Sequence, residues 1–404
     1  MTSGLRWYLA STACFLVPGG IQMVMFPYLV AVFLAESPAR VGAAQMASQL
    51  PMLLLILWGG LLGDRIDQRR LLVGLSIAMA VPPLIMAGLV WADRLSYAVL
   101  VAWALVGGAF AAFAQPARDA LLNRVAGPDI QRVVTMAVGV QFGIQILGFA
   151  AGAGADRVGP ALLMLVQSAF MLAAAMATLR VPPLPPRPAR VSAPALREIG
   201  EGLALAWRLV EVRAAIILTF SVGIFFAGAY MVLLPLMVRD LYQGSAAGIA
   251  GAFAANMLGT CTTILVLMRR GGVQRTGRAL MLGGAVSVSV LAVLHFELSQ
   301  PAFYGVVYLW GLCGGISMTM TRAIVQEASP ETHRARIMSV YSLGMMGGMP
   351  IGSLLLGWSA GAVGVRSAVL VPVIGMALVL LLLRLTTDLW QVERRALKPV
   401  PAAA

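Results

Sequence analysis

The chain has 404 residues, of which 60% are hydrophobic and 11% are charged, and its mean hydropathy is +0.89. Because about one quarter of the residues in soluble domains are charged, this composition excludes a water-soluble globular protein. The formal charge of +13 does not indicate a nucleic-acid-binding protein, since the basic residues lie in short gaps between apolar segments instead of on one dense basic face.

Twelve segments are long and apolar enough to cross a bilayer as helices, which takes about twenty apolar residues. The first segment follows Arg6 without a small-residue cleavage site, so we interpret it as a spanning helix and not as a signal peptide. We therefore predict an all-α membrane protein. Its expected spans, in chain order, are 7–35, 40–63, 71–92, 95–117, 133–154, 159–180, 214–238, 245–268, 279–297, 301–325, 337–359 and 366–384.

The basic residues predict the orientation, because cytoplasmic loops retain Lys and Arg. With both termini in the cytoplasm, only five of the 29 Lys and Arg residues fall outside: Arg40, Arg94, Arg157, Arg239 and Arg366. We expect a multi-pass protein of the bacterial cytoplasmic (inner) membrane with both termini inside.

The longest interruption, residues 181–212, divides the chain into two similar halves. It begins with a proline-rich linker, and residues 195–208 then have the spacing of an amphipathic helix that lies on the cytoplasmic membrane surface. A weak internal repeat has an offset near 203 residues: Pro128 and Asp129, for example, are echoed by Pro330 and Glu331. The expected domains are a six-helix bundle at 1–180, the linker at 181–212, a second six-helix bundle at 213–384 and a cytoplasmic tail at 385–404.

The segment Gly59-Gly-Leu-Leu-Gly-Asp-Arg-Ile-Asp-Gln-Arg-Arg-Leu-Leu72 lies between spans two and three. It resembles the major facilitator superfamily, whose members carry G-x-L-a-D-R-x-G-R-R in this loop, although Asp67 stands where most members have glycine. The D-R-(F/Y)-(D/E)-R-R variant is similar to the branch with the enterobactin exporter and related drug-efflux carriers. The stretches at 116–122, 230–236 and 326–343 extend the resemblance to that branch over nearly the whole chain.

The resemblance implies two six-helix bundles that rock about a central cavity. It also implies a gating motif, which here comprises Gly60, Asp64, Arg65, Arg69 and Arg118. Our hypothesis is that Asp64 forms charge-assisted pairs across the interface of the two halves. The alternative is that the cluster is only a positive-inside anchor.

Small residues recur every fourth position on spans five, eight and eleven, where helices in lipid approach closely. Examples are Gly148 and Gly152 on span five, Gly259 on span eight, and Gly344 and Gly348 on span eleven. In the resembled superfamily these spans, together with span two, form the moving interface. Static packing alone is the alternative interpretation.

A polar and aromatic set on the spans that line the cavity of the resembled fold is our candidate for contact with a solute, although packing is the alternative for each aromatic residue. Buried amides in lipid favour a cavity or a partner helix. The set is Gln22, Phe26, Tyr28, Phe113, Gln115, Gln141, Gln145, Phe225, Tyr230, Asn256, Trp310, Met318 and Thr321.

Enzymatic and metal chemistry finds no support in the sequence. Cys14, Cys261 and Cys313 lie far apart without CxxC spacing, the two histidines fall on opposite predicted sides, and no phosphate loop ending in GK(S/T) is present. We expect no catalytic residue, no metal and no cofactor. No carboxylate lies at mid-depth in a span, and the middle of span four has no arginine, so proton coupling is only an implication of the resemblance.

These observations predict a secondary transporter that exports amphipathic small organic molecules, such as a drug, siderophore or metabolite, by alternating access. An importer or facilitator of a small organic nutrient with the same fold is the alternative. A sensor or assembly factor would carry an added soluble domain, and the largest loop here is about thirty residues. The expected partners are a small organic solute, membrane lipid and protons, not nucleic acid, and we expect the chain to function as a monomer.

Overall fold

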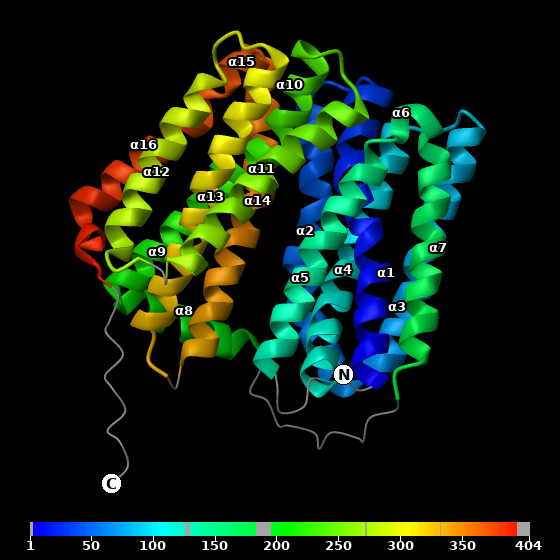
Figure 1. Cartoon of the computed structure of the whole chain (residues 1–404), viewed down its shortest axis with the longest axis horizontal. Helices are drawn as coiled ribbons and strands as arrows, with labels where there is room; N and C mark the ends of the chain where they lie inside the picture. The colour runs from blue at the N-terminus through cyan, green and yellow to red at the C-terminus, as the bar shows by residue number, and fades with distance from the viewer. Residues whose placement is uncertain (1–2, 126–129, 183–194, 271–272, 332, 394–404) are drawn as a thin grey trace. The chain divides into compact units, whose positions relative to one another are not determined.

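The computed structural model describes residues 3–125, 130–182, 195–270, 273–331 and 333–393, and the regular secondary structure in these ranges consists of helices (Figure 1). Ten helices in this part of the chain are long and apolar enough to cross a membrane. Each of the twelve predicted spans coincides with one helix or with a run of consecutive helices. The repeat positions Pro128 and Asp129, residues 183–194 of the linker and residues 394–404 of the tail lie outside the described residues.

The first half of the sequence contains the helices of spans one to six. Span one begins as α1 (Ser3–Tyr28) and ends as the π-helix η1 (Leu29–Phe33). The following helices are α2 (Pro38–Arg65), α3 (Gln68–Trp91), α4 (Tyr97–Val125), α5 (Ile130–Gly152), the short α6 (Ala155–Val158) and α7 (Pro160–Leu179).

The second half begins with α8 (Ala195–Arg208), whose position on a membrane surface stays a prediction. Span seven is a run of four helices, α9 (Val210–Val222), η2 (Gly223–Ala227), η3 (Ala229–Leu233) and α10 (Leu234–Leu241). Then follow α11 (Ala246–Arg269), α12 (Thr276–Val293), α13 (Gln300–Ala328), α14 (Arg334–Val363), α15 (Val365–Ala368), α16 (Leu370–Thr386) and the 3-10 turn η4 (Leu389–Gln391).

The chain forms two compact units. Unit 1 comprises residues 1–195, 227–254 and 349–368, and unit 2 comprises residues 196–226, 255–348 and 369–404. In unit 1, α1 packs against α5 and α7, α3 packs against α4 and α7, and α2 packs against α4. In unit 2, α12 and α9 each pack against both α13 and α16 (Figure 1). Unit 1 therefore contains the whole first half together with parts of α11, α14 and span seven from the second half.

Glycines bring helix backbones into direct contact within each half, as expected where association in lipid depends on packing. A Cβ at Gly148 would lie 2.6 Å from the Cα of Gly20 in α1, and one at Gly259 would lie 2.1 Å from the backbone oxygen of Tyr308 in α13. A Cβ at Gly348 would lie 2.3 Å from the backbone oxygen of Phe220 in α9. These predicted small-residue positions pack against helices of their own half, which supports the packing interpretation.

Spans one and seven both change from α-helix to π-helix near the same position of the repeat, at η1 and η3. Pro27 lies just before η1 and Pro235 just after η3. Proline has no backbone N–H, so it removes one helical hydrogen bond and favours a local change in winding. The two spans therefore have their irregular turns close to the ends that are predicted to face outside.

Candidate functional site

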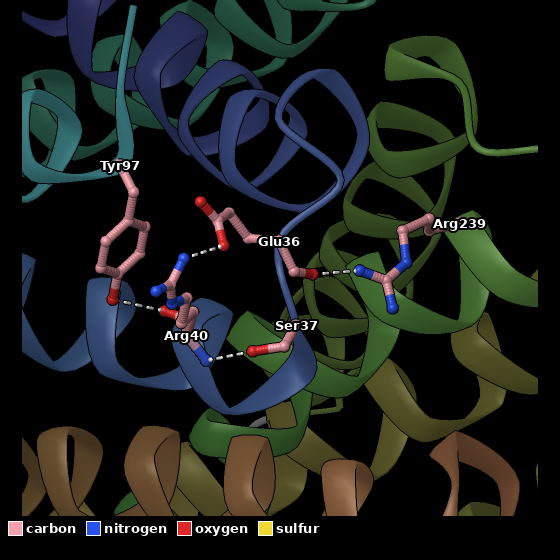
Figure 2. A network of polar contacts seen from close by, with 5 residues as sticks. All are labelled: Glu36, Ser37, Arg40, Tyr97 and Arg239. Carbon is pink, nitrogen blue, oxygen red and sulfur yellow. Dashed lines mark hydrogen bonds and ion pairs between the residues drawn. The ribbon is translucent and has the colours of Figure 1, made fainter.

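The strongest polar contacts between the two sequence halves lie inside unit 1, at the predicted external ends of the spans. Arg239, at the end of α10, donates from Nη1 to the backbone oxygen of Glu36 at 2.6 Å and to that of Ala31 at 3.4 Å. Figure 2 shows the guanidinium pointing at the Glu36 carbonyl. Ala31 lies in η1 and Glu36 follows it, so a cation from the second half donates hydrogen bonds to carbonyl groups at the end of a first-half helix.

Arg239 is held in place by its neighbour. Its Nε lies 2.5 Å from Asp240 Oδ1, and its side chain is only 19% exposed. Arg239 follows Glu36 by 203 residues, so the two residues occupy equivalent positions of the internal repeat. The sequence alone does not reveal this pair, because the acceptor is a backbone carbonyl and not the Glu36 carboxylate.

A second contact runs in the opposite direction, from the first half to a helix of the second. Asp156, in α6, accepts hydrogen bonds through Oδ2 from the backbone nitrogens of Ala246 at 2.7 Å and Ala247 at 3.4 Å. These nitrogens are the first of α11, where N–H groups lack helical acceptors and a carboxylate is favoured by the helix dipole. The Tyr28 hydroxyl also hydrogen-bonds to Asp156.

We call Tyr28, Glu36, Asp156, Arg239 and Ala246 the outer cluster. It contains two reciprocal contacts, a second-half arginine on the end of a first-half helix and a first-half aspartate on the start of a second-half helix. Each contact is charge-assisted and uses backbone groups, so it needs one particular alignment of the helix ends. The outer cluster can therefore form only when these ends lie together.

A more exposed set surrounds Glu36 on the first-half side (Figure 2). The Glu36 carboxylate pairs with Arg40 Nη1 at 2.9 Å, and the Tyr97 hydroxyl donates to the Arg40 backbone oxygen at 3.0 Å. The Arg40 side chain is 60% exposed. Exposed pairs contribute little to stability, so this set orients the loop after η1 and does not hold the halves together.

Close backbone packing accompanies the outer cluster. A Cβ at Gly42 in α2 would lie 2.4 Å from the backbone oxygen of Ser353 and 2.8 Å from the Cα of Gly357, both in α14. Gln49 Nε2 donates to Ser353 Oγ at 3.3 Å. The contact between α2 and α14 thus requires glycine at residue 42, and it is the small-residue contact in unit 1 that joins the two halves.

The predicted gating motif makes its described contacts inside the first half. Arg69 donates from Nε to the Thr178 backbone oxygen at 3.4 Å and from Nη2 to that of Leu179, at the end of α7. Asp67 accepts from the Arg70 backbone nitrogen at 3.0 Å and so caps α3. Gly60, Asp64 and Arg65 lie in α2, but their side chains are outside the described part of the chain, so the Asp64 hypothesis stays a prediction.

Arg118 follows the expected end of span four at residue 117. The helix α4 continues to Val125, and Arg118 is 7% exposed inside it. Its guanidinium carbon lies 4.2 Å from the centre of the Phe15 ring, and among the described residues its Nη1 has no hydrogen-bond partner. Beyond the apolar run, the Phe15 ring of α1 therefore covers Arg118, while Asp119 is exposed. The role of Arg118 in the gating motif stays a prediction.

The predicted solute set is divided between the two units. In unit 1, Gln22 lines a cavity, Phe26 packs edge-on against Trp103, and Tyr230 stacks on Phe253. Gln115 donates a hydrogen bond to Asp119, and Gln145 donates one to Met23 Sδ. Phe113 is half-buried and Gln141 is exposed. In unit 2, Phe225 lies near Gly375, Asn256 donates to the Val307 carbonyl and Trp310 packs against Phe226. Met318 is 53% exposed, and buried Thr321 bonds its own helix.

These thirteen residues therefore do not form one site within either unit, and their joint contact with a solute stays a prediction. Tyr28 has a different described role, since it bonds Asp156 in the outer cluster. The residues that sequence reasoning missed are Arg239 and Asp156. Their only signal was that each is a charged residue close to a predicted external span end.

Comparison with known proteins decides the family. The family model of the Major Facilitator Superfamily matches residues 8–331 and 279–403, which is most of the chain. The chain belongs to the major facilitator superfamily. A search of curated proteins finds no match.

Solved structures of transporters share the fold of this superfamily member. A crystal structure of the nucleoside transporter NupG aligns with a TM-score of 0.77 at 11% identity, covering 95% of this chain and 99% of that chain. An auto-inhibited POT family peptide transporter aligns with a TM-score of 0.70 at 14% identity, covering 100% and 99%. A bacterial homolog of the human lysosomal transporter Spinster gives 0.69 at 13% identity, covering 96% and 95%. Identities this low show the fold alone.

Proposed function

We propose that this protein is a secondary transporter of the bacterial inner membrane, with both termini in the cytoplasm, that exports amphipathic small organic molecules by alternating access. The observation that carries the proposal is the outer cluster. Its reciprocal contacts, Arg239 on the end of η1 and Asp156 on the start of α11, join the sequence halves at the span ends that are predicted to be external.

The energies of these contacts suit a gate. A hydrogen bond to a charged group contributes about 1.5 to 3 kcal/mol net, so two such contacts stabilise a closed outer end without making it permanent. A solute that binds the alternative state more tightly by a similar free energy can open it. The close approach of Gly42 to Gly357 adds shape specificity to the same closed arrangement.

The solute class follows from the predicted solute set and from the family branch. Aromatic, methionine and amide side chains favour amphipathic or aromatic molecules and offer little to small, highly charged ones. Export follows from the resemblance of the loop at 59–72 to the efflux branch. The expectation of a monomer belongs to the same proposal.

Transport is tested in a bacterial host stripped of its own efflux carriers. Cells that express the protein should accumulate less Nile red and less ethidium than cells with an empty vector. The variant Arg239→Ala should lose most of this difference, whereas Arg94→Ala, which changes an exposed arginine on the same predicted side, should keep it. Unchanged accumulation of both dyes, together with uptake of labelled uridine, would contradict export and favour the nutrient importer.

Alternating access is tested with a reversible cross-link. In a background in which Cys14, Cys261 and Cys313 are replaced by serine, Asp156→Cys and Ala246→Cys place thiols on two residues that are in direct contact, since Asp156 Oδ2 and the Ala246 backbone nitrogen lie 2.7 Å apart. Oxidation should stop dye efflux and reduction should restore it in the same cells. Efflux that continues in fully cross-linked protein would show that the outer cluster need not open.

A further inference from the structure

A cavity of about 280 Å³ lies within unit 1, between α1, α3, α4 and α7, with one residue of α2 at its wall. All of its lining residues belong to the first half of the sequence, between Phe15 and Met171. The cavity is therefore a feature of the first predicted bundle alone. It does not depend on the outer cluster or on any contact with the second half.

The wall of the cavity is aromatic, sulfur-containing and uncharged. Phe15, Trp103 and Phe110 contribute rings, and Met79 and Met171 contribute thioethers. None of the described lining residues carries a charge, and the nearby cation of Arg118 lies against the Phe15 ring. Aromatic rings and polarizable thioethers favour a flat, uncharged, aromatic occupant.

Polar groups in the lining can recognise a donor. Gln22 and Gln167 contribute amides, and Ser48 contributes a hydroxyl. Pro83 contributes indirectly: it has no N–H, so the carbonyl of Met79, one turn earlier in α3, lacks the usual hydrogen bond from residue 83. A carbonyl without its helical partner in an apolar wall is a preferred acceptor for an N–H or O–H group. A ligand with one such donor would satisfy it.

The size of the cavity sets the size of the ligand. An apolar cavity of about 150 Å³ holds one benzene molecule, and typical ligand pockets start at about 300 Å³. A volume near 280 Å³ therefore suits two fused rings. The space is open at the helix backbones too, because a Cβ added at Gly19 or Gly107 would have no heavy atom within 4 Å.

We propose that this cavity is a binding site for a small, uncharged, two-ring aromatic molecule with one N–H or O–H donor. The rings pack between Trp103, Phe110 and the two methionines, and the donor reaches Gln22 or the Met79 carbonyl. The site lies inside one half and needs no movement, although Gln22 also belongs to the predicted solute set, so its link to transport rests on the proposed function. Its ligand is either a transported solute or a compound that binds without being moved.

Binding is tested with 5-fluoroindole, which has two fused rings and one N–H, on the purified full-length protein by ¹⁹F NMR. Saturable line broadening is expected for the wild type. The variant Gly107→Leu, which places a branched side chain in the open space, should weaken binding by at least about tenfold, because the remaining volume no longer holds two rings. The control Gly74→Leu adds the same side chain to an open position of α3 outside the cavity and should leave binding unchanged.

The same samples separate the possible outcomes. Thermal unfolding shows whether Gly107→Leu is folded, and Gly19→Leu, at a second open position of the wall, replaces it if it is not. Absence of saturable binding to the wild type, or wild-type binding by the two cavity variants, would overturn the site while leaving dye efflux untouched. A loss of 5-fluoroindole efflux in parallel with binding identifies the ligand as a transported solute, and unchanged 5-fluoroindole efflux with lost binding identifies a compound that this site does not move.

Discussion

The predicted external end of unit 1 and the conspicuous motif at 59–72 are both rich in charge, but they use it differently. Around the motif, Arg69 and Asp67 satisfy the ends of α7 and α3, which belong to the same half. In the outer cluster, Arg239 and Asp156 satisfy helix ends of the opposite half. The described charges of the motif therefore bind within one half, whereas isolated charges outside any motif bind across the two halves.

The largest effect that would test this comparison is expected at Gly42. The variant Gly42→Leu places a side chain where even a Cβ lies 2.4 Å from the Ser353 backbone oxygen, so α2 and α14 must move apart. Overpacking of this kind costs about 1 to 3 kcal/mol, and we expect dye efflux to fall about tenfold or more. Gly88→Leu, at an open position of α3, is the matched control and should transport normally.

The next largest effect is expected at Asp156. Asp156→Ala leaves the first N–H groups of α11 without their acceptor, at a cost of about 1 to 2 kcal/mol. We expect labelling of Ala246→Cys by a membrane-impermeant maleimide to increase about tenfold. Asp156→Asn retains an acceptor oxygen and should lie between the wild type and alanine. Equal labelling in all three proteins would mean that Asp156 does not hold the outer end closed.

A smaller effect, of a different kind, is expected at Arg69. Arg69→Ala removes the cation from the final carbonyls of α7 and should lower the stability of the purified protein by about 1 kcal/mol. Labelling of Ala246→Cys should stay at its wild-type level, because the described contacts of Arg69 lie within the first half. An increase as large as that of Asp156→Ala would remove the distinction between the two regions.

The smallest effect is expected at Arg40, whose side chain is mostly exposed, pairs with Glu36 and lies over the Tyr97 ring, both in the same half. Arg40→Ala should change dye efflux by less than about twofold, since exposed pairs contribute little. Arg239→Ala is the informative partner measurement, because both residues lie beside Glu36 (Figure 2). Equal losses in the two variants would show that charge near Glu36 matters more than contact between the halves.

Sequence reasoning reached the twelve spans and the family because both depend on local signals. A run of apolar residues predicts a membrane span without reference to the rest of the chain. The motif at 59–72 is likewise one contiguous segment, so it can be identified in the sequence alone. It was least accurate where a helix carries polar residues, as at Arg118, since hydropathy ends at residue 117 but α4 ends at Val125. There the deciding factor is the cover that Phe15 supplies from another helix.

The sequence by itself determined the helical membrane fold, the number of spans and the family of this protein, because the free energy of placing apolar residues in lipid is summed along the chain. Only the tertiary structure decided which charges join the halves and where a cavity remains. Arg239 and Asp156 bind backbone groups, which every residue carries, so their partners leave no trace in the sequence. The cavity likewise depends on the packing of different helices, which places Gly107 and Pro83 in the lining of one space.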